Sequence, residues 1–324
     1  MTQALVAVRN AVKPSLLQLE AGDCVLVAVS GGADSLALAY AVLTEATALA
    51  ISVVGVTVDH QLQANSAAQA ENVLQQLKDM GYDKVIVEKV RVDTSSGIEA
   101  GARSARYQAL MDCSKKEHAV KIYLGHTLDD QAETVLLGLA RGSGARSLSG
   151  MATENGIYLR PFLALTRTHT ERACQDLGIK FWNDPHNKNL EFTRARVRLE
   201  VLPLMEEKLG PGISSALART AHLLRDDADA LDAIAATEIA ASNLSSLDCD
   251  HLATLHRAIR TRVIRAAMYA CGAPDGSINA EHVAAAEALV TAWSGQGAVS
   301  LPGGVKVERI SGRLSLLAEQ PHTK

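Results

Sequence analysis

One short stretch, Ser30-Gly31-Gly32-Ala33-Asp34-Ser35, constrains the fold of this chain more than any other. It follows the valine-rich apolar run 24–29 and precedes the helix-forming run 36–43. This pattern is typical of a buried parallel strand that turns at two glycines into a helix. The first amides of a helix have no partner within it, and the helix dipole adds positive charge there. The stretch therefore predicts an anion site, with phosphate as its natural ligand.

The residues also restrict the kind of phosphate loop. A Walker A loop needs a Gly-Lys pair, which the chain lacks, and the glycine spacing of the dinucleotide fingerprint is absent as well. The remaining pattern, Ser-Gly-Gly-x-Asp-Ser after a strand, resembles the pyrophosphate-binding loop of the ATP pyrophosphatases. In that family the loop amides hold the leaving pyrophosphate and the chemistry falls on the α-phosphate. From the residues alone, the alternative is a glycine-rich turn with Asp34 as a helix cap.

The first two-thirds of the chain alternate between strand and helix patterns. After the loop we expect strands over 51–58, 84–90 and 120–124, and helices over 66–80, from about 98, over 129–139 and over 165–178. This order predicts an α/β fold with a doubly wound parallel sheet, whose ligands bind at the carboxyl ends of the strands. The Ser30 loop, Asp59-His60 and Gly125-His126 all follow strands, so we expect them to face one crevice.

The remainder of the chain predicts a smaller, mainly helical domain. Pro203, Gly210, Pro211 and Gly212 punctuate the sequence, so we expect an ATP-binding catalytic domain over 1–210 and a C-terminal domain over 211–324. Helices are expected over 214–241, 248–271 and 279–293, and a closing β-meander over 298–301, 305–307 and 313–317.

Composition sets limits on the environment and the partners. No apolar run in the 324 residues approaches membrane-spanning length, so we expect a cytoplasmic protein with no membrane partner. The five cysteines include no Cys-x-x-Cys pair, which argues against a zinc ribbon or an iron–sulfur cluster. The net charge is −4, yet residues 141–198 hold ten basic against five acidic side chains. A polyanion would therefore be bound locally, with salt-sensitive affinity.

A second group of reactive residues lies in the stretch 125–134, Gly-His-Thr-Leu-Asp-Asp-Gln-Ala-Glu-Thr. If a helix begins near Asp129, Asp130 and Glu133 share one face of its first turn, where the helix dipole keeps carboxylates ionised. Two fixed negative charges beside an anionic nucleotide require a cation, which is a Mg²⁺ ion, an ammonium group or both. A metal hydrolase with His126, Asp130 and Glu133 as ligands is the alternative, although a second histidine in helical register is missing.

These motifs and three others together resemble the tRNA(Ile)-lysidine synthetases over roughly residues 20 to 210. The other motifs are Glu99-Ala-Gly-Ala-Arg-Ser-Ala-Arg-Tyr107, Arg141-Gly-Ser-Gly144, and Asp184-Pro-His-Asn187 with Arg194-Ala-Arg-Val-Arg198. The resemblance implies an ATP-dependent ligation in the PP-loop superfamily. The wobble cytidine of tRNA(Ile) with a CAU anticodon is adenylated on its position-2 oxygen. The ε-amino group of free L-lysine then displaces AMP.

The resemblance also assigns roles by position. Ser30, Gly31, Gly32, Ala33, Asp34 and Ser35 would bind ATP, and Asp34 would also take Mg²⁺. Asp130 and Glu133 would orient the lysine ammonium. Arg106 and His126 would contact the nucleotide phosphates, and Arg194 would lie close to the reacting base. For the domain over 211–324, tRNA binding, homodimer formation and simple packing all stay open.

The chain departs from the family pattern at a few positions. Many relatives have His-His in place of His126-Thr127, Ser in place of His186 and Asn in place of Ala195. The nearest alternative enzyme is a PP-loop tRNA thiolase, but such enzymes commonly depend on paired cysteines. An alternative of a different class is a nucleotide-binding module without turnover, which would bind ATP and never release pyrophosphate.

Overall fold

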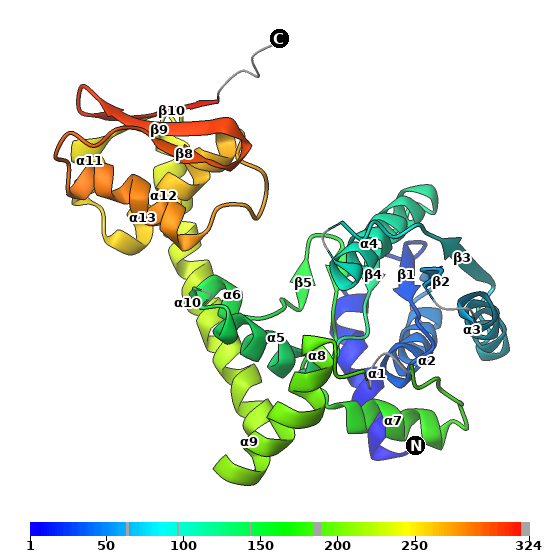
Figure 1. The fold of residues 1–324 in the computed structure, drawn as a ribbon. Coiled ribbons are helices and arrows are strands. Elements are labelled where there is room, and N and C mark those ends of the chain that lie inside the picture. Colours follow the sequence, from blue (N-terminus) through cyan, green and yellow to red (C-terminus); the bar gives the residue numbers. More distant parts are fainter. Residues whose placement is uncertain (63–64, 96, 143, 185–188, 319–324) are drawn as a thin grey trace. The chain divides into compact units, whose positions relative to one another are not determined.

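The computed structural model describes residues 1–62, 65–95, 97–142, 144–184 and 189–318 (Figure 1). By internal packing the chain divides into two compact units. Unit 1 comprises residues 1–143 and 147–222, and unit 2 comprises residues 144–146 and 223–324. The division between residues 222 and 223 falls within the long helix α10 (Ile213–Ala241). Residues 185–187 of the predicted Asp184–Asn187 motif and Ser143 of the Arg141–Gly144 motif lie outside the described residues.

Unit 1 is an α/β fold, as its alternating pattern predicts. Its strands are β1 (Cys24–Ala28), β2 (Ser52–Asp59), β3 (Lys84–Lys89), β4 (Lys121–Tyr123), β5 (Glu154–Asn155) and β6 (Tyr158–Leu159). Its helices, up to α10, are α1 (Gln3–Leu16), α2 (Ala33–Thr47), α3 (Ser66–Met80), α4 (Ile98–Lys116), α5 (Leu128–Ala140), α7 (Arg167–Asp176), α8 (Thr193–Arg196), the π-helix η2 (Val197–Val201) and α9 (Leu202–Leu209). The short helix α6 (Ala145–Leu148) crosses the division between the units.

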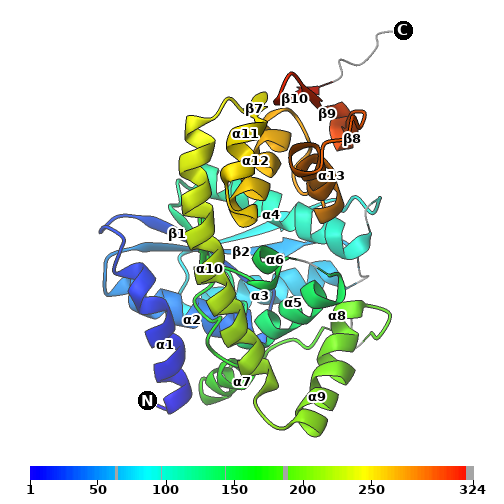
Figure 2. The same ribbon diagram turned by 90° about the vertical axis from the view of Figure 1, so that its left-hand side faces the viewer.

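The sheet of unit 1 has the order β3-β2-β1-β4-β6-β5, and all its neighbouring pairs are parallel except β5 with β6. Alternate residues of β1 enter different hydrophobic clusters, because successive side chains of a strand point to opposite faces. Val25 and Val27 pack with α1, α2 and α7, whereas Leu26 packs with the α4 side. Figure 2 shows α4 on one side of the strands and α2 and α3 on the other. The predicted doubly wound parallel sheet is confirmed.

Unit 2 combines helices with an antiparallel sheet. Its elements are β7 (Ser246–Asp248), α11 (Cys249–Thr254), α12 (Arg257–Ala270), α13 (Ala280–Thr291), β8 (Val299–Leu301), the 3-10 helix η3 (Pro302–Gly304), β9 (Val305–Ile310) and β10 (Arg313–Ala318). The sheet order is β7-β10-β9-β8, so the predicted meander over 298–317 is present and a fourth strand joins it. One expectation was wrong. The single helix predicted over 248–271 is two helices, because Leu255 is extended and His256 caps α12 by accepting from the Ala258 amide.

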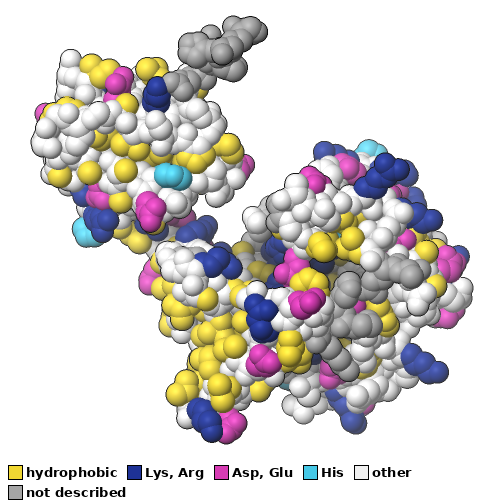
Figure 3. All heavy atoms as spheres, viewed as in Figure 1, with side chains coloured by type: hydrophobic (Ala, Val, Ile, Leu, Met, Phe, Trp, Pro, Cys, Tyr) yellow, Lys and Arg dark blue, Asp and Glu magenta, His cyan; other side chains and the backbone are white. Residues whose placement is uncertain are grey.

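The described residues contain no helix with the length and hydrophobicity needed to cross a membrane. All five cysteines are free thiols. In Figure 3 apolar side chains gather on the surface over α9, where Leu204 and Leu209 are 54% and 69% exposed.

Candidate active site

The turn after β1 is built to leave main-chain amides open. Gly31 has a φ of +87°, in the left-handed region that favours glycine, and Gly32 is the N-cap of α2 with no side-chain hydrogen bond to the helix. The Ser35 hydroxyl donates to the Gly32 carbonyl at 2.9 Å and accepts from the Ser30 amide at 3.1 Å, which holds the loop in shape. Because no side chain caps α2, its first amides stay available for an anion.

Asp34 does not cap the helix, so that alternative is wrong. It is the second residue of α2, and its carboxylate points to α7. There Oδ1 accepts from the Thr170 hydroxyl, and Oδ2 lies 3.5 Å from Nε of Arg167. Burial raises the pKa of Asp34 to about 6, although Thr170 and Arg167 both act to lower it. A buried carboxylate with an oxygen that is only loosely engaged can bind a cation.

Gly125, after β4, brings the second group of reactive residues against this turn. A Cβ built on Gly125 would lie 3.0 Å from the carbonyl carbon and oxygen of Asp34 and 3.1 Å from the Ser35 amide nitrogen. A side chain there would press on the backbone of α2, which would have to shift by a few tenths of an ångström. The glycine therefore lets the start of α2 and the segment before α5 approach each other, whereas the single crevice expected from the strand ends stays a prediction.

Asp130 closes the first turn of α5. Its Oδ2 accepts from the Thr127 amide at 2.9 Å, in a capping box, and its Oδ1 lies 3.4 Å from Nη2 of Arg167 and 3.3 Å from Nη2 of Arg198. Burial alone would raise the pKa of Asp130, but the Arg167 guanidinium and the Thr127 amide lower it overall. Asp130 is therefore an anion at neutral pH.

Glu133 is fully buried and bound by arginines. Nε of Arg194 donates to Oε2 at 2.8 Å, and Nε of Arg198 donates to Oε1 at 2.6 Å. Nη2 of Arg167 lies 4.0 Å away. The sequence predicted that a cation is needed beside Asp130 and Glu133. In the structure the guanidinium groups of arginines supply this positive charge. These arginines also take both oxygens of Glu133, so a single-ion hydrolase site with His126 is not what the geometry offers.

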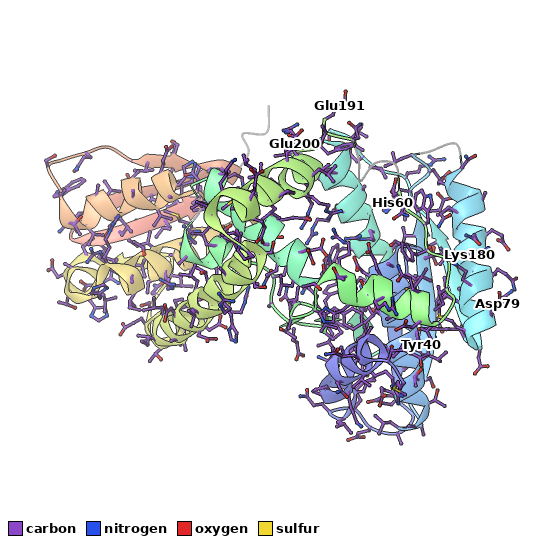
Figure 4. The ribbon with its side chains drawn as sticks, turned by 90° about the horizontal axis from the view of Figure 1, so that it is seen from below. Tyr40, His60, Asp79, Lys180, Glu191 and Glu200 are labelled. Atoms are coloured by element: carbon purple, nitrogen blue, oxygen red, sulfur yellow. The ribbon has the colours of Figure 1, made fainter. Side chains whose placement is uncertain are left out.

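Several buried nitrogen atoms near the strand ends have no hydrogen-bond partner among the residues that the structure describes. They are Nε of Arg106, Nδ1 of His126 and Nδ1 of His60, which follows β2 and is labelled in Figure 4. Burial is the largest of the effects that lower the pKa of His126 to about 3. The charges of Arg106 and Arg160 also act to lower it and Asp130 acts to raise it, so the ring is neutral at pH 7. Unpartnered buried polar groups are costly and rare. A guanidinium or ring N–H of this kind beside cationic arginines suits an anionic ligand.

A small cavity of about 180 Å³ lies next to Glu133. Its walls carry both signs of charge and are formed by Asp129, Glu133, Arg167, Arg198, Leu202, Pro203, Glu206 and Ser214. Among the described residues, no three His, Cys, Asp or Glu side chains are grouped as a metal site. A divalent ion bound at Asp34 would therefore need further ligands from a bound molecule.

The sequence analysis missed Arg167 and Thr170. Both belong to the first turns of α7, and they lie 133 and 136 residues from Asp34 in the chain. The helix itself was predicted, but only the packing of α7 against α2 places its first turn beside the loop. Arg198 was noted as part of an arginine series with Arg194 and Arg196, of which Arg196 turns instead to the carbonyls of Leu190 and Glu191.

A sheet with this order, a glycine turn with open amides after β1 and a buried aspartate in α2 define a PP-loop protein of the ATP-binding α/β class. A family model described as a PP-loop domain matches residues 5–205. A second model, described as the TilS substrate binding domain, matches residues 247–315. The chain belongs to the tRNA(Ile)-lysidine synthase family.

Curated relatives match over nearly the whole chain. The tRNA(Ile)-lysidine synthase of Thermobifida fusca is 52% identical, over 96% of this chain and 97% of its own. That of Streptomyces coelicolor is 48% identical, over 91% and 86%. Among solved structures, the U34-tRNA thiolase NcsA from Methanococcus maripaludis with its [4Fe-4S] cluster is similar, with a TM-score of 0.58 and 16% identity over 68% of this chain and 79% of that one. At this identity the likeness concerns the fold alone.

Proposed function

We propose that this chain is an ATP-dependent C–N ligase that joins free L-lysine to the wobble cytidine of tRNA(Ile) with a CAU anticodon. One observation carries the proposal beyond family membership. Asp34 of the phosphate loop and Asp130 of the second group contact the same guanidinium, that of Arg167. The residues suited to splitting ATP and those suited to holding an amine therefore form one site.

ATP is the first substrate, and its phosphates fit the residues of the loop. The open amides of α2 would hold the β- and γ-phosphates that leave as pyrophosphate. The unpartnered Arg106 Nε and His126 Nδ1 support the role expected of these residues toward phosphate oxygens. Ser30 and Ser35 bond to each other's polar atoms, so their part is to shape the loop.

Mg²⁺ would be held by Asp34 together with the phosphates of ATP. The residues fit, because Mg²⁺ in nucleotide sites takes one or two carboxylates and completes its shell with phosphate and water oxygens. The weakly held Oδ2 of Asp34 is the available protein ligand. Bound there, the ion would neutralise the charge that develops on the departing pyrophosphate.

The reaction has two steps. The position-2 oxygen of the cytidine attacks the α-phosphorus, and the bond to pyrophosphate breaks. The ε-nitrogen of lysine then bonds to C2, the C2–O bond breaks, and the oxygen leaves with AMP. The amine must lose a proton to attack. Asp130, which unlike Glu133 is partly exposed to solvent, is the carboxylate that would orient it. The charged cavity beside Glu133 supports lysine as the guest, since free lysine carries charges of both signs.

The tRNA would engage unit 2 as well as the catalytic residues. The match to a substrate-binding domain over 247–315 supports this role for the helical unit. Arg194 remains our candidate for the residue near the reacting base, although it pairs with Glu133 here. A homodimer is also part of the proposal, to be measured by light scattering in solution.

The decisive experiment supplies ATP, radiolabelled lysine and unmodified tRNA(Ile) and follows label into the RNA. A tRNA(Ile) with uridine in place of the wobble cytidine is the matched control, because uridine lacks the exocyclic amino group that completes the product. We expect label in the first RNA only, with one AMP and one pyrophosphate released per lysine. A thiolase would incorporate sulfur instead of lysine. A nucleotide-binding module would bind ATP without releasing pyrophosphate.

A further inference from the structure

Arg167 contacts acidic residues from two helices at once. Its Nε lies 3.5 Å from Asp34 in α2, and its Nη2 lies 3.4 Å from Asp130 and 4.0 Å from Glu133 in α5. The Arg167 side chain is 24% exposed, and the carboxylates it faces are between 0% and 21% exposed. One positive charge therefore serves several partly or fully buried negative charges, which would otherwise repel one another.

These contacts are loose compared with those of the neighbouring arginines. Charge-assisted hydrogen bonds to carboxylates are about 2.7 to 2.9 Å long. Arg194 and Arg198 approach Glu133 at 2.8 and 2.6 Å, whereas among the described residues no guanidinium contact of Arg167 is shorter than 3.4 Å. Arg194 and Arg198 thus have a close partner in Glu133, although Arg198 also lies 3.3 Å from Asp130. Arg167 supplies charge to the middle of the site and is committed to no single partner.

The backbone of Arg167 is fixed even though its guanidinium is loosely held. Its amide donates to Oδ2 of Asp129 at 2.7 Å, and one turn further along α7 the buried Thr170 donates to Asp34. The start of α7 is therefore tied to both α5 and α2. A change at the nucleotide side can move the Arg167 side chain without displacing the helix that carries it.

We propose that Arg167 is a positioning residue that couples the two small-molecule subsites of the enzyme. This inference rests on the proposed function, in which the Asp34 side takes the nucleotide and the Asp130 side takes the amine. Without nucleotide, Arg167 is the counter-ion of Asp130 and competes with an incoming ammonium group. The phosphates of bound ATP draw the guanidinium toward the loop. Arg198, whose Nη2 lies 3.3 Å from Oδ1, then remains beside Asp130, but the positive charge that competes there with the lysine is reduced.

The consequence is an order of events. Lysine binds weakly until ATP is in place, so the amine meets its carboxylate only when the oxygen of the RNA can be activated. Coupling between two sites is reciprocal, so lysine also tightens the binding of the nucleotide by the same factor. The factor expected for a single shared charge lies at the low end of the usual range of about 5- to 150-fold.

The test measures lysine affinity by calorimetry, with and without Mg²⁺ and α,β-methylene-ATP, which cannot be split at the α-phosphate. For the unchanged protein we expect lysine to bind at least about fivefold more tightly with the nucleotide analogue. In Arg167→Gln the affinity for lysine without nucleotide should rise, because the charge of Arg167 no longer competes. The gain in lysine affinity on adding the nucleotide analogue should fall below half of the gain in the unchanged protein. Arg167→Lys, which keeps the charge, should restore part of the gain.

The control is Arg172→Gln on the exposed face of α7. Among the described residues Arg172 pairs only with Asp176, at 3.0 Å, and its side chain is 65% exposed. It should leave the coupling unchanged. An Arg167→Gln variant that folds, binds lysine and keeps the full gain from nucleotide would overturn the proposal. If the unchanged protein binds no lysine under any condition, both the inference and the proposed function fail, whereas retained coupling in the variant removes the inference alone.

Discussion

Nε of Arg198 donates to Oε1 of Glu133 at 2.6 Å, and the Glu133 side chain has no exposure to solvent. A buried carboxylate is tolerable only when it is paired and hydrogen-bonded. Here the partners come from the segment 194–198, so the carboxylate joins α5 to that segment as well as facing the site. Glu133 therefore has a part in folding, and its proposed part in the reaction can be separated from it by experiment.

Glu133→Gln should destabilise the protein and impair its use of lysine. The neutral amide leaves Arg194 and Arg198 without their shared anion, and breaking a buried pair typically costs about 3 to 5 kcal/mol. Chemical denaturation gives the loss in the free energy of unfolding, and kinetics below the melting temperature give KM for each substrate. We expect KM for lysine to rise more than KM for ATP.

The control for this variant is Glu207→Gln, a surface position paired with Lys208, which should change stability by less than about 1 kcal/mol. Equal effects on both substrates would contradict the assignment of Glu133 to the amine.

Asp34→Asn should abolish AMP formation and leave the fold intact. The amide has the same shape and can still accept from Thr170, but it cannot supply the negative charge that a divalent ion needs. The measurement combines pyrophosphate release with circular dichroism at the same temperature. Full turnover by this variant would remove the proposed metal role of Asp34.

The same residue should shape the dependence of stability on pH. Burial raises the pKa of folded Asp34 to about 6 from an ordinary value of 3.8, so the folded state binds this proton more tightly than the unfolded chain. The resulting stabilisation is complete below about pH 4 and is lost as pH rises through about 6. The difference in unfolding free energy between the unchanged protein and Asp34→Asn should therefore fall by roughly 2 to 3 kcal/mol from pH 4 to pH 7. Denaturant titrations across this range would reveal it, and parallel curves for the two proteins would refute it.

Gly125→Ala should weaken ATP binding through the backbone. The added methyl group would lie 3.0 Å from the Asp34 carbonyl, so the start of α2 must move. Such overpacking commonly costs about 1 to 3 kcal/mol, and we expect the Kd for ATP to rise about tenfold or more. Gly297→Ala is the matched control, because a Cβ there meets no atom within 4 Å and the φ angle is not in the left-handed region. An unchanged Kd in Gly125→Ala would show that the close approach does not govern the loop.

Local patterns in the sequence were enough to predict the strand, turn and helix around Ser30, because a short apolar run and paired glycines act over a few residues. Asp130 and Glu133 were placed together for the same reason, since residues three apart share a helix face. The helix α1 was not predicted, although its buried residues Leu5, Val8, Val12 and Leu16 follow a helical spacing that was open to inspection.

Other features depended on contacts that no local pattern contains. Arg167 lies close to Asp34 only because α7 packs against α2. The guanidinium groups that pair with Asp130 and Glu133 likewise come from segments far along the chain, at Arg167 and Arg198. The sequence indicated that a cation was needed but could not distinguish an ion from an arginine. The break between α11 and α12 was equally hidden, because it involves neither proline nor glycine and depends on the capping by His256.

The Ser35 hydroxyl bonds within its own turn, to the Gly32 carbonyl and the Ser30 amide, so the atoms of the turn hold its shape themselves. The turn is thus preorganised, so the conformational entropy of ordering it is lost when the chain folds and not when a nucleotide binds. A triphosphate can dock without waiting for the backbone to rearrange around it.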